Sequence, residues 1–439
     1  MPLLSIALGI LIILLLVSKL KWNIFIALLI TSFVVGAING MNVNAILQSV
    51  LFGIGETTGK ILLIIIFGTM LGKLIEESGA AHTITYWFIS VFGEKRLPVA
   101  LMLTGFAIGL PMVYNASFLV LIPLVYTFAA TTRFPLLYLG IPLCATLSVA
   151  HGYLPPHPAP TTVAAMIHAN INLTLVYGIL VGVPAILIAG PFLARFFKHV
   201  IVLPPKELFS AREFDKSELP GIGISLFTVL IPIILMVTGA IFNIFVGGKG
   251  TLASFFSFIS EPNFALFFAV MVGIYTLGTR RGRSVDLVMK SLTNSVGSVA
   301  LIIMIIAAGG AFKQVLIDSN AGKYIEAMAH DMNASPLILA WGTAALLRLA
   351  LGSATVATIT AAGMMVPLVT GTDVSRELVV LATGSGSLMF SHFNDTGFWM
   401  FKEYFNLTIK QTFMSWTVME CIVSTAGLLG VLALNWIFY

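Results

Sequence analysis

Long apolar segments recur along the whole sequence, and they restrict the possible fold more than any other feature. Examples are residues 61–71 with their flanks, 173–197 and 222–245. A helix of about 20 apolar residues crosses the roughly 30 Å hydrocarbon core of a bilayer. Charged residues make up only 9% of the chain, against about 25% in soluble domains. The sequence therefore predicts an all-α polytopic membrane protein with the lipid bilayer as its surroundings.

We predict about ten full spans. The first has no basic stretch before it and no small-residue cleavage site, so it is interpreted as a span rather than a signal peptide. Cys144 and Cys421 lie in apolar segments, which is typical of packing residues rather than of a disulfide or metal pair. The predicted spans are residues 3–18, 22–39, 58–76, 136–150 with a continuation after a break, 173–196, 220–245, 262–279, 297–315, 377–391 with a second break, and 412–437.

Two further segments, residues 97–130 and 336–370, differ from these spans. Each has two apolar arms of about 14 residues around a polar or Gly/Pro-bearing tip. An arm of that length rises only about 21 Å, which is short of a full crossing. We predict that each segment is a re-entrant hairpin, which enters and leaves the membrane on one face.

Polar backbone is predicted at membrane depth in four clusters: two hairpin tips and two helix breaks. Such backbone survives there only where it is buried in protein or lines a cavity, and freed helix N-termini favour anions. The clusters therefore predict a site for a small hydroxylated anion, although Gly and Ser also occur simply where helices pack closely. The tips are residues 109–117 and 352–355, and the breaks are residues 151–162, with four prolines in positions 155–160, and 384–397.

The two halves of the chain align at an offset of 241 residues, which places His151 on His392 and one predicted tip on the other. An odd number of predicted crossings separates equivalent helices, so the second copy is inverted. Inverted repeats with broken helices are typical of secondary transporters. The predicted units are a first repeat at 1–200 (hairpin 97–130, broken helix 136–170), a cytoplasmic linker at 201–219, and a second repeat at 220–439 (hairpin 336–370, broken helix 377–404).

The basic residues predict the orientation. On the predicted topology, 17 Lys and Arg residues fall on one side, 5 fall on the other, and Arg348 lies inside a hairpin. Because basic residues concentrate in cytoplasmic loops, both termini are expected on the extracytoplasmic side. The net charge of +5 gives no indication of a nucleic-acid partner.

Several ionisable residues fall within the predicted spans, where they are costly and usually functional. Asp395 is the candidate proton-carrying carboxylate, and the alternative is that it caps the helix restarting at Gly397. His151 and His392 could relay protons, bind substrate hydroxyls, or simply pack. Arg348 could anchor a substrate carboxylate, or pair with Asp395 or a carbonyl group.

Glu56 and Lys60 are spaced i, i+4 at the mouth of a predicted span. They form either a helix-stabilising pair or a coupling or substrate-binding group. His157 lies between prolines and is expected to hold the shape of the break. No nucleotide-binding loop, zinc-ligand set or nucleophilic triad is recognisable, so the sequence predicts neither an ATP-driven pump nor an enzyme, and no cofactor or metal.

At these motifs the chain resembles the gluconate permease family, gluconate:proton symporters of the bacterial inner membrane, nearly from end to end. The resemblance implies a proton-coupled importer of sugar acids in the wider ion-transporter superfamily. It also implies a homodimer in which a transport domain holding both hairpins slides, like an elevator, against a fixed scaffold. The matching segments are residues 151–161 (HGYLPPHPAPT), 350–357 (ALGSATVA), 384–387 (GSGS), 390–399 (FSHFNDTGFW) and 401–409 (FKEYFNLTI).

The four clusters supply the candidate site. Asp395 and Glu56 are candidates for proton coupling, and Arg348 is a candidate carboxylate anchor. Members of the family carry a glutamate where this chain has Asn115 and a glycine where it has Glu56, so we hypothesise that Glu56 reaches the same cavity and replaces the missing carboxylate. The candidate substrate-binding residues are Asn115, His151, Thr161, Gly352, Ser353, Thr355, Gly384, Ser385, Ser387, His392 and Asn394.

Alternative functions remain open from the sequence. Within the family, D-serine or another small hydroxy acid is the rival substrate. From a different class, the chain is a passive channel or a sensor that binds its ligand without moving it. A channel needs a continuous polar pore, whereas here polar backbone is predicted at the centre and charge is scarce along the spans.

Overall fold

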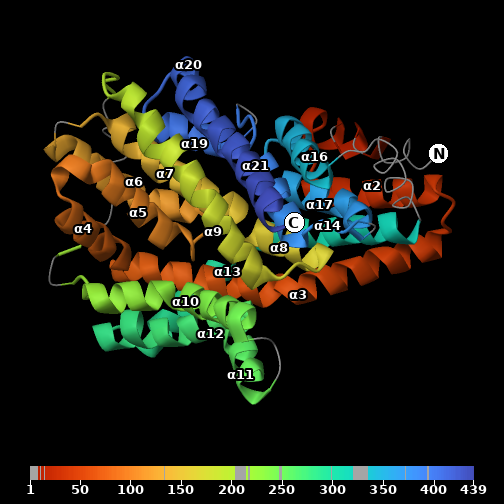
Figure 1. Cartoon of the computed structure of the whole chain (residues 1–439), viewed down its shortest axis with the longest axis horizontal. Helices are drawn as coiled ribbons and strands as arrows, with labels where there is room; N and C mark the ends of the chain where they lie inside the picture. Colours follow the sequence, from red (N-terminus) through yellow and green to blue (C-terminus); the bar gives the residue numbers. More distant parts are fainter. Residues whose placement is uncertain are drawn as a thin grey trace.

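The computed structural model describes residues 8–9, 11–13, 15–132, 134–202, 214–215, 218–246, 250–297, 299–319, 335–370, 372–392 and 395–439. Every regular element among these residues is a helix, which confirms the predicted all-α class (Figure 1). Seven of the described helices are long and apolar enough to cross a membrane: Val43–Ser78, Leu136–Ile167, Ile171–Phe197, Ile222–Phe242, Pro262–Arg281, Ala300–Asp318 and Ile409–Phe438.

The described helices divide between the two halves of the chain. In the first half they are α2 (Ile24–Ile38), α3 (Val43–Ser78), α4 (Ala80–Phe92), α5 (Leu97–Gly109), α6 (Tyr114–Thr131), α7 (Leu136–Tyr153), α8 (Pro158–Ile167) and α9 (Ile171–Leu187). In the second half they are α10 (Ile222–Val246), α11 (Thr251–Ile259), α12 (Pro262–Gly273), α13 (Val285–Gly297), α14 (Ala300–Asp318), α16 (Pro336–Leu351), α17 (Ala354–Thr370), α18 (Arg376–Gly386), α19 (Thr396–Tyr404), α20 (Ile409–Thr412) and α21 (Val418–Phe438).

Some predicted spans differ from the helices observed. Helix α2 has 15 residues, and α18 has 11 and ends at Gly386, because glycine and serine at its C-terminal end are poor helix formers. Residues 3–7, 10 and 14 of the first predicted span, residues 3–18, lie outside the described residues. The total number of crossings, the re-entrant hairpins and the inverted repeats stay predictions.

Helix α3 is much longer than the predicted span at 58–76. It has 36 residues, or about 54 Å at 1.5 Å per residue, and runs along the long axis of the molecule (Figure 1). The Asn42 side chain accepts a hydrogen bond from Ala45 N (2.8 Å) at its start, and Gly79 ends it with φ 76°. Glu56 and Lys60 therefore lie inside a helix rather than at its start. Their place at the mouth of a membrane span stays a prediction.

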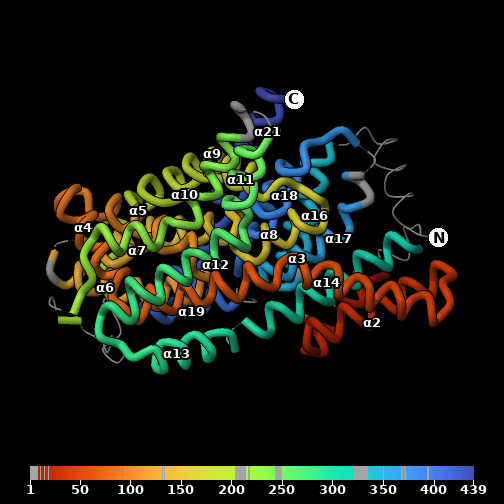
Figure 2. The backbone as a smooth tube through the Cα atoms, turned by 90° about the horizontal axis from the view of Figure 1, so that it is seen from below, coloured from red at the N-terminus to blue at the C-terminus, as the bar shows by residue number. Residues whose placement is uncertain are grey.

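Helices α3 and α14 cross with their backbones in contact. A Cβ atom added to Gly53 would lie 2.3 Å from Gly310 O, and one added to Gly310 would lie 2.4 Å from Gly53 O. Such close approach between membrane helices requires small residues. Helices α13 and α14 follow one another beside α3 (Figure 2). The crossing therefore joins the two halves of the chain.

A second close contact joins the two helix breaks. A Cβ atom on Gly384, in α18, would lie 2.1 Å from Gly152 O, in the last turn of α7. No side chain fits between these two backbones. The contact holds the end of α7 against α18, next to the cavity described below.

We predict that Gly384→Ala destabilises the protein, because the new methyl group overlaps a backbone carbonyl that cannot move aside. Overpacking of this kind costs about 1–3 kcal/mol. Gly59→Ala is the matched control, since nothing lies within 4 Å of a Cβ at that helical position and alanine favours a helix over glycine by about 1 kcal/mol. Thermal unfolding in detergent should show a lower midpoint for Gly384→Ala alone; equal midpoints for the two variants contradict the contact.

Candidate functional site

Four of the short non-helical segments that separate consecutive helices fall in the polar clusters of the sequence. These segments are residues 110–113 between α5 and α6, 154–157 between α7 and α8, 352–353 between α16 and α17, and, among the described residues, 387–392 between α18 and α19. Proline starts α8 at Pro158, a position where its missing N–H costs nothing.

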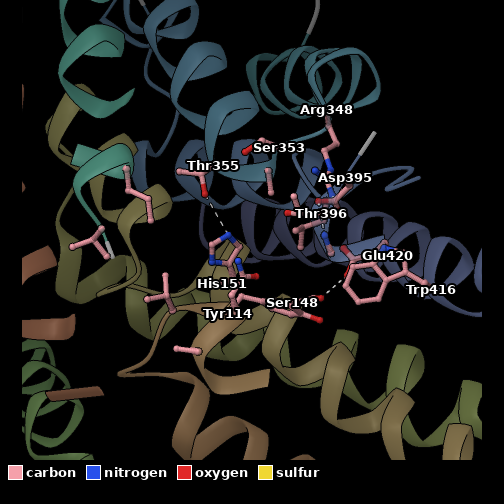
Figure 3. Close-up of a pocket in the computed structure, with 18 residues that line it drawn as sticks. Tyr114, Ser148, His151, Arg348, Ser353, Thr355, Asp395, Thr396, Trp416 and Glu420 are labelled. Carbon is pink, nitrogen blue, oxygen red and sulfur yellow. Dashed lines mark hydrogen bonds and ion pairs between the residues drawn. The ribbon is translucent and has the colours of Figure 1, made fainter. Parts of the chain in front are cut away.

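A cavity of about 280 Å³ lies beside these interruptions, and Val113, Ser353 and Leu388, from three of them, line it. This volume is close to the lower end of the range for small-molecule pockets, about 300–1,000 Å³. Polar and aromatic side chains from several elements point toward it (Figure 3). The lining residues are Val113, Tyr114, Asn115, Ala116, Ser148, His151, Val299, Ile302, Arg348, Ser353, Ala354, Thr355, Leu388, Asp395, Thr396, Gly397, Trp416 and Glu420.

An ion pair between Arg348 and Asp395 lies in the cavity wall. Arg348, in the last turn of α16, is 3% exposed, and Asp395, just before α19, is 8% exposed. Arg348 Nη2 donates to Asp395 Oδ2, and Asp395 Oδ1 accepts from Gly397 N at 3.0 Å. Asp395 therefore both caps α19 and pairs with Arg348, as the two structural alternatives from the sequence anticipated.

Further hydrogen bonds hold this ion pair in place. Arg348 Nη1 donates to Gly352 O, at the turn between α16 and α17. Ser391 Oγ donates to Asp395 Oδ2 and accepts from Trp416 Nε1 at 2.7 Å. A buried ion pair persists only where such hydrogen bonds offset its desolvation. Among the described residues, Arg348 Nε has no hydrogen-bond partner.

His151 connects the end of α7 to the first turn of α17. Its Nε2 lies 3.4 Å from Thr355 Oγ1, and no described residue hydrogen-bonds its buried Nδ1. The Tyr114 ring meets it edge-on at 6.2 Å between centroids, and meets Trp416 at 6.0 Å. The cavity thus has aromatic walls and a histidine with one ring nitrogen unused.

Glu420 is a lining residue that the sequence analysis missed. It lies in the first turn of α21 and is 1% exposed. Ser148 Oγ donates to its Oε1, and its Oε2 is left without a hydrogen-bond partner in the described part of the chain. A carboxylate within the apolar span at 412–437 was a usable signal. Tyr114, Ser148 and Trp416 were also missed, and no motif distinguishes them.

The predicted site residues divide into two groups. Asn115, His151, Arg348, Ser353, Thr355 and Asp395 line the cavity. Gly352, Thr161, Gly384, Ser385, Ser387 and His392 do not, and Asn394 lies outside the described residues.

Three of the residues outside the lining are engaged elsewhere. Ser385 Oγ donates to Ala382 O at 3.0 Å and Ser387 Oγ to Gly384 O at 2.7 Å, so both hydroxyls serve their own helix. His392 Nδ1 lies 3.0 Å from Phe390 O. A direct substrate contact by these three residues has no support in this geometry.

Glu56 lies away from the cavity. It pairs with Lys60 and, at 3.0 Å, with Lys313 of α14, and it does not line the cavity that holds Asn115. The hypothesis that it reaches that cavity does not hold in this structure, because its carboxylate is bound at the α3–α14 crossing. A coupling role for Glu56 stays a prediction.

His157 holds the first break in place, as expected. It is buried, and its Nε2 lies 2.7 Å from Gly109 O at the end of α5.

A second cavity of about 320 Å³ shares Val113 and Ala116 with the first and includes Lys73 and Glu76. The described residues contain no cluster of His, Cys, Asp and Glu able to hold a metal ion.

Comparison with known proteins identifies the family. The sequence signature described as GntP family permease matches residues 1–437. The chain belongs to the GntP permease family. It is 46% identical to the Gnt-II system L-idonate transporter and 45% identical to a high-affinity gluconate transporter, both of Escherichia coli (strain K12), over 99% of each chain. A gluconate permease of Bacillus subtilis (strain 168) is 42% identical over 99% of each chain.

The family confirms the resemblance drawn from the motifs and makes this GntP permease a multi-pass membrane transporter, not an enzyme. Two solved structures share its fold at low identity. The YdaH transporter of Alcanivorax borkumensis has a TM-score of 0.63 at 17% identity, over 94% of this chain and 97% of that one. MtrF of Neisseria gonorrhoeae has a TM-score of 0.64 at 16% identity, over 95% and 94%.

We predict that Arg348→Met strongly destabilises the permease, because it leaves the buried Asp395 carboxylate without its cation. Breaking a buried ion pair from one side costs about 3–5 kcal/mol. In Arg348→Met/Asp395→Asn the charge is gone, while asparagine can still cap α19. Unfolding in detergent should therefore show the double variant to be more stable than Arg348→Met. A double variant less stable than either single variant contradicts the pairing.

Proposed function

We propose that this GntP permease imports gluconate or a closely related aldonate together with protons across the bacterial inner membrane. The observation that carries the proposal is the buried Arg348, which lines a small polar cavity. The relatives at 42–46% identity that are named for gluconate and L-idonate support the same substrate class.

The cavity suits the chemistry of a sugar acid. Such a molecule carries one carboxylate and several hydroxyls, and Arg348 is the one Lys or Arg among the described lining residues. Guanidinium binds carboxylate through charge-assisted hydrogen bonds. Around it, hydroxyl, amide and imidazole groups can donate to or accept from sugar hydroxyls: Asn115, Ser148, His151, Ser353, Thr355 and Thr396.

Proton coupling follows from competition for Arg348. In this structure the Asp395 carboxylate binds the guanidinium. A substrate carboxylate arriving at Arg348 would place two negative charges beside one positive charge in a buried site, which is costly. A proton on Asp395 removes one of the negative charges and frees Arg348 for the substrate. Proton and anion would therefore bind together, with Asp395 as the coupling residue.

We further propose that the interrupted helices around the cavity belong to a transport domain that moves, elevator-like, against a scaffold in a homodimer. Three of the four interruptions line the cavity, so a bound substrate would move with them. The predicted division into repeats at 1–200 and 220–439, with both termini extracytoplasmic, is part of this proposal.

Uptake into proteoliposomes tests the function. With an inward proton gradient we expect labelled gluconate to accumulate above its external concentration, because each anion enters with a proton. An uncoupler that collapses the gradient should abolish accumulation, and sodium should be dispensable. Unlabelled L-idonate should compete, since it has the same carboxylate and hydroxyl chemistry.

Other outcomes identify the alternatives. Equilibration without accumulation indicates a channel, and binding without uptake indicates a sensor. Competition by D-serine but not by L-idonate contradicts the aldonate class, and a sodium requirement contradicts proton coupling.

A further inference from the structure

The Glu420 carboxyl group has no place in the coupling scheme above, although it lines the same cavity. It is almost fully buried, at 1% exposed, and comes from α21 rather than from the interrupted helices. One oxygen, Oε1, accepts from Ser148 Oγ, whereas no described residue hydrogen-bonds Oε2. An orphaned polar atom buried in a cavity wall costs free energy unless a ligand or water satisfies it.

Among the residues that the structure describes, no cation is free to neutralise a charge on Glu420. Arg348 is the cation that bears on it, and Arg348 is already paired with Asp395, whose own negative charge also bears on Glu420. The other described titratable side chains that interact with Glu420 carry no charge in their protonated form; they are Tyr114 of α6, Cys144 and Tyr153 of α7, and Cys421 of α21. An isolated ionised carboxylate is far more costly to bury than a neutral acid. Burial without a free cation therefore favours the neutral acid, whose O–H can be donated in a hydrogen bond.

We propose that Glu420, as a neutral carboxylic acid oriented by Ser148, donates a hydrogen bond from Oε2 to a hydroxyl group of the bound sugar acid. Ser148 donates to Oε1, which leaves the O–H of the neutral acid on Oε2, the oxygen without a partner among the described residues. In Figure 3 Ser148 and Glu420 lie together, apart from Arg348. This inference rests on the proposed function: Arg348 would bind the carboxylate and Glu420 would recognise a hydroxyl.

Such a contact makes Glu420 a specificity residue. A donor built to meet a substrate hydroxyl rejects analogues that lack it, because the buried group is then left unpaired. A small acid without a hydroxyl at that position should bind more weakly than gluconate, even if its carboxylate binds Arg348 equally well.

Binding to the full-length permease in detergent, measured by calorimetry, tests the inference. Glu420→Gln keeps the shape and one N–H donor, so its affinity for gluconate should stay within about threefold of wild type. Glu420→Met removes the donor and should weaken gluconate binding by about tenfold or more. The control is Glu403→Met, which replaces an exposed carboxylate of α19 that pairs with Lys402 and should bind like wild type.

Monodeoxy gluconates locate the contact. One of them should bind wild type about tenfold more weakly than gluconate, and for that analogue Glu420→Met should cause little further loss. If Glu420→Met proves unstable, Ser148→Ala replaces it, because loss of the orienting hydroxyl should weaken gluconate binding and spare the same analogue.

The inference is overturned if Glu420→Met, or Ser148→Ala where that variant replaces it, binds gluconate like wild type. It is also overturned if that variant loses affinity equally for gluconate and for every monodeoxy analogue. A third contradicting result is that Glu420→Gln binds gluconate as weakly as Glu420→Met. Loss of proton-driven accumulation in Glu420→Gln with binding intact also overturns it, by making Glu420 the proton carrier. If wild-type protein binds neither gluconate nor L-idonate, the proposed function itself is contradicted. The results for the variants test only the role of Glu420.

Discussion

The ion pair between Arg348 and Asp395 is the interaction on which the site depends. The guanidinium also holds the Gly352 carbonyl at the turn between α16 and α17, while the carboxylate caps α19. Through Ser391, the same carboxylate is linked to Trp416, near the start of α21. One buried pair thus fixes three elements around the cavity. Buried ion pairs are weak stabilisers compared with apolar packing, and a pair in a cavity wall suits the exchange of partners that we propose for transport.

The surrounding helices bring polar backbone to this point without filling the space. Close backbone contacts at Gly53 with Gly310, and at Gly152 with Gly384, join the two halves of the chain through small residues. The helix interruptions then release backbone groups and short hydroxyl side chains beside the cavity. Non-helical backbone is stable inside a membrane protein only in such a setting. The close packing at the glycines therefore holds in place the interrupted helices that carry the polar groups of the site.

Much of this architecture was predictable from the sequence, because apolar length and proline position act locally. Tertiary pairing was not. Glu56 has a visible partner at i+4, but its second partner, Lys313, lies in another helix, and this partner ties Glu56 to a helix crossing away from the cavity. The hydroxyls of Ser385 and Ser387 fall in a polar cluster, yet they hydrogen-bond their own helix. Glu420 stands outside the motifs; its carboxylate in an apolar span was a usable signal, but its place beside the cavity depends on tertiary packing.

The central claim is that a proton on Asp395 frees Arg348 for the substrate carboxylate. It is tested most directly by adding gluconate to purified permease in weakly buffered detergent solution and following pH with an indicator dye. The account predicts that wild type takes up protons as gluconate binds, and that Asp395→Asn, which has no carboxylate to protonate, binds gluconate with no proton uptake. Binding by wild type without proton uptake, or equal uptake by both proteins, would contradict the account.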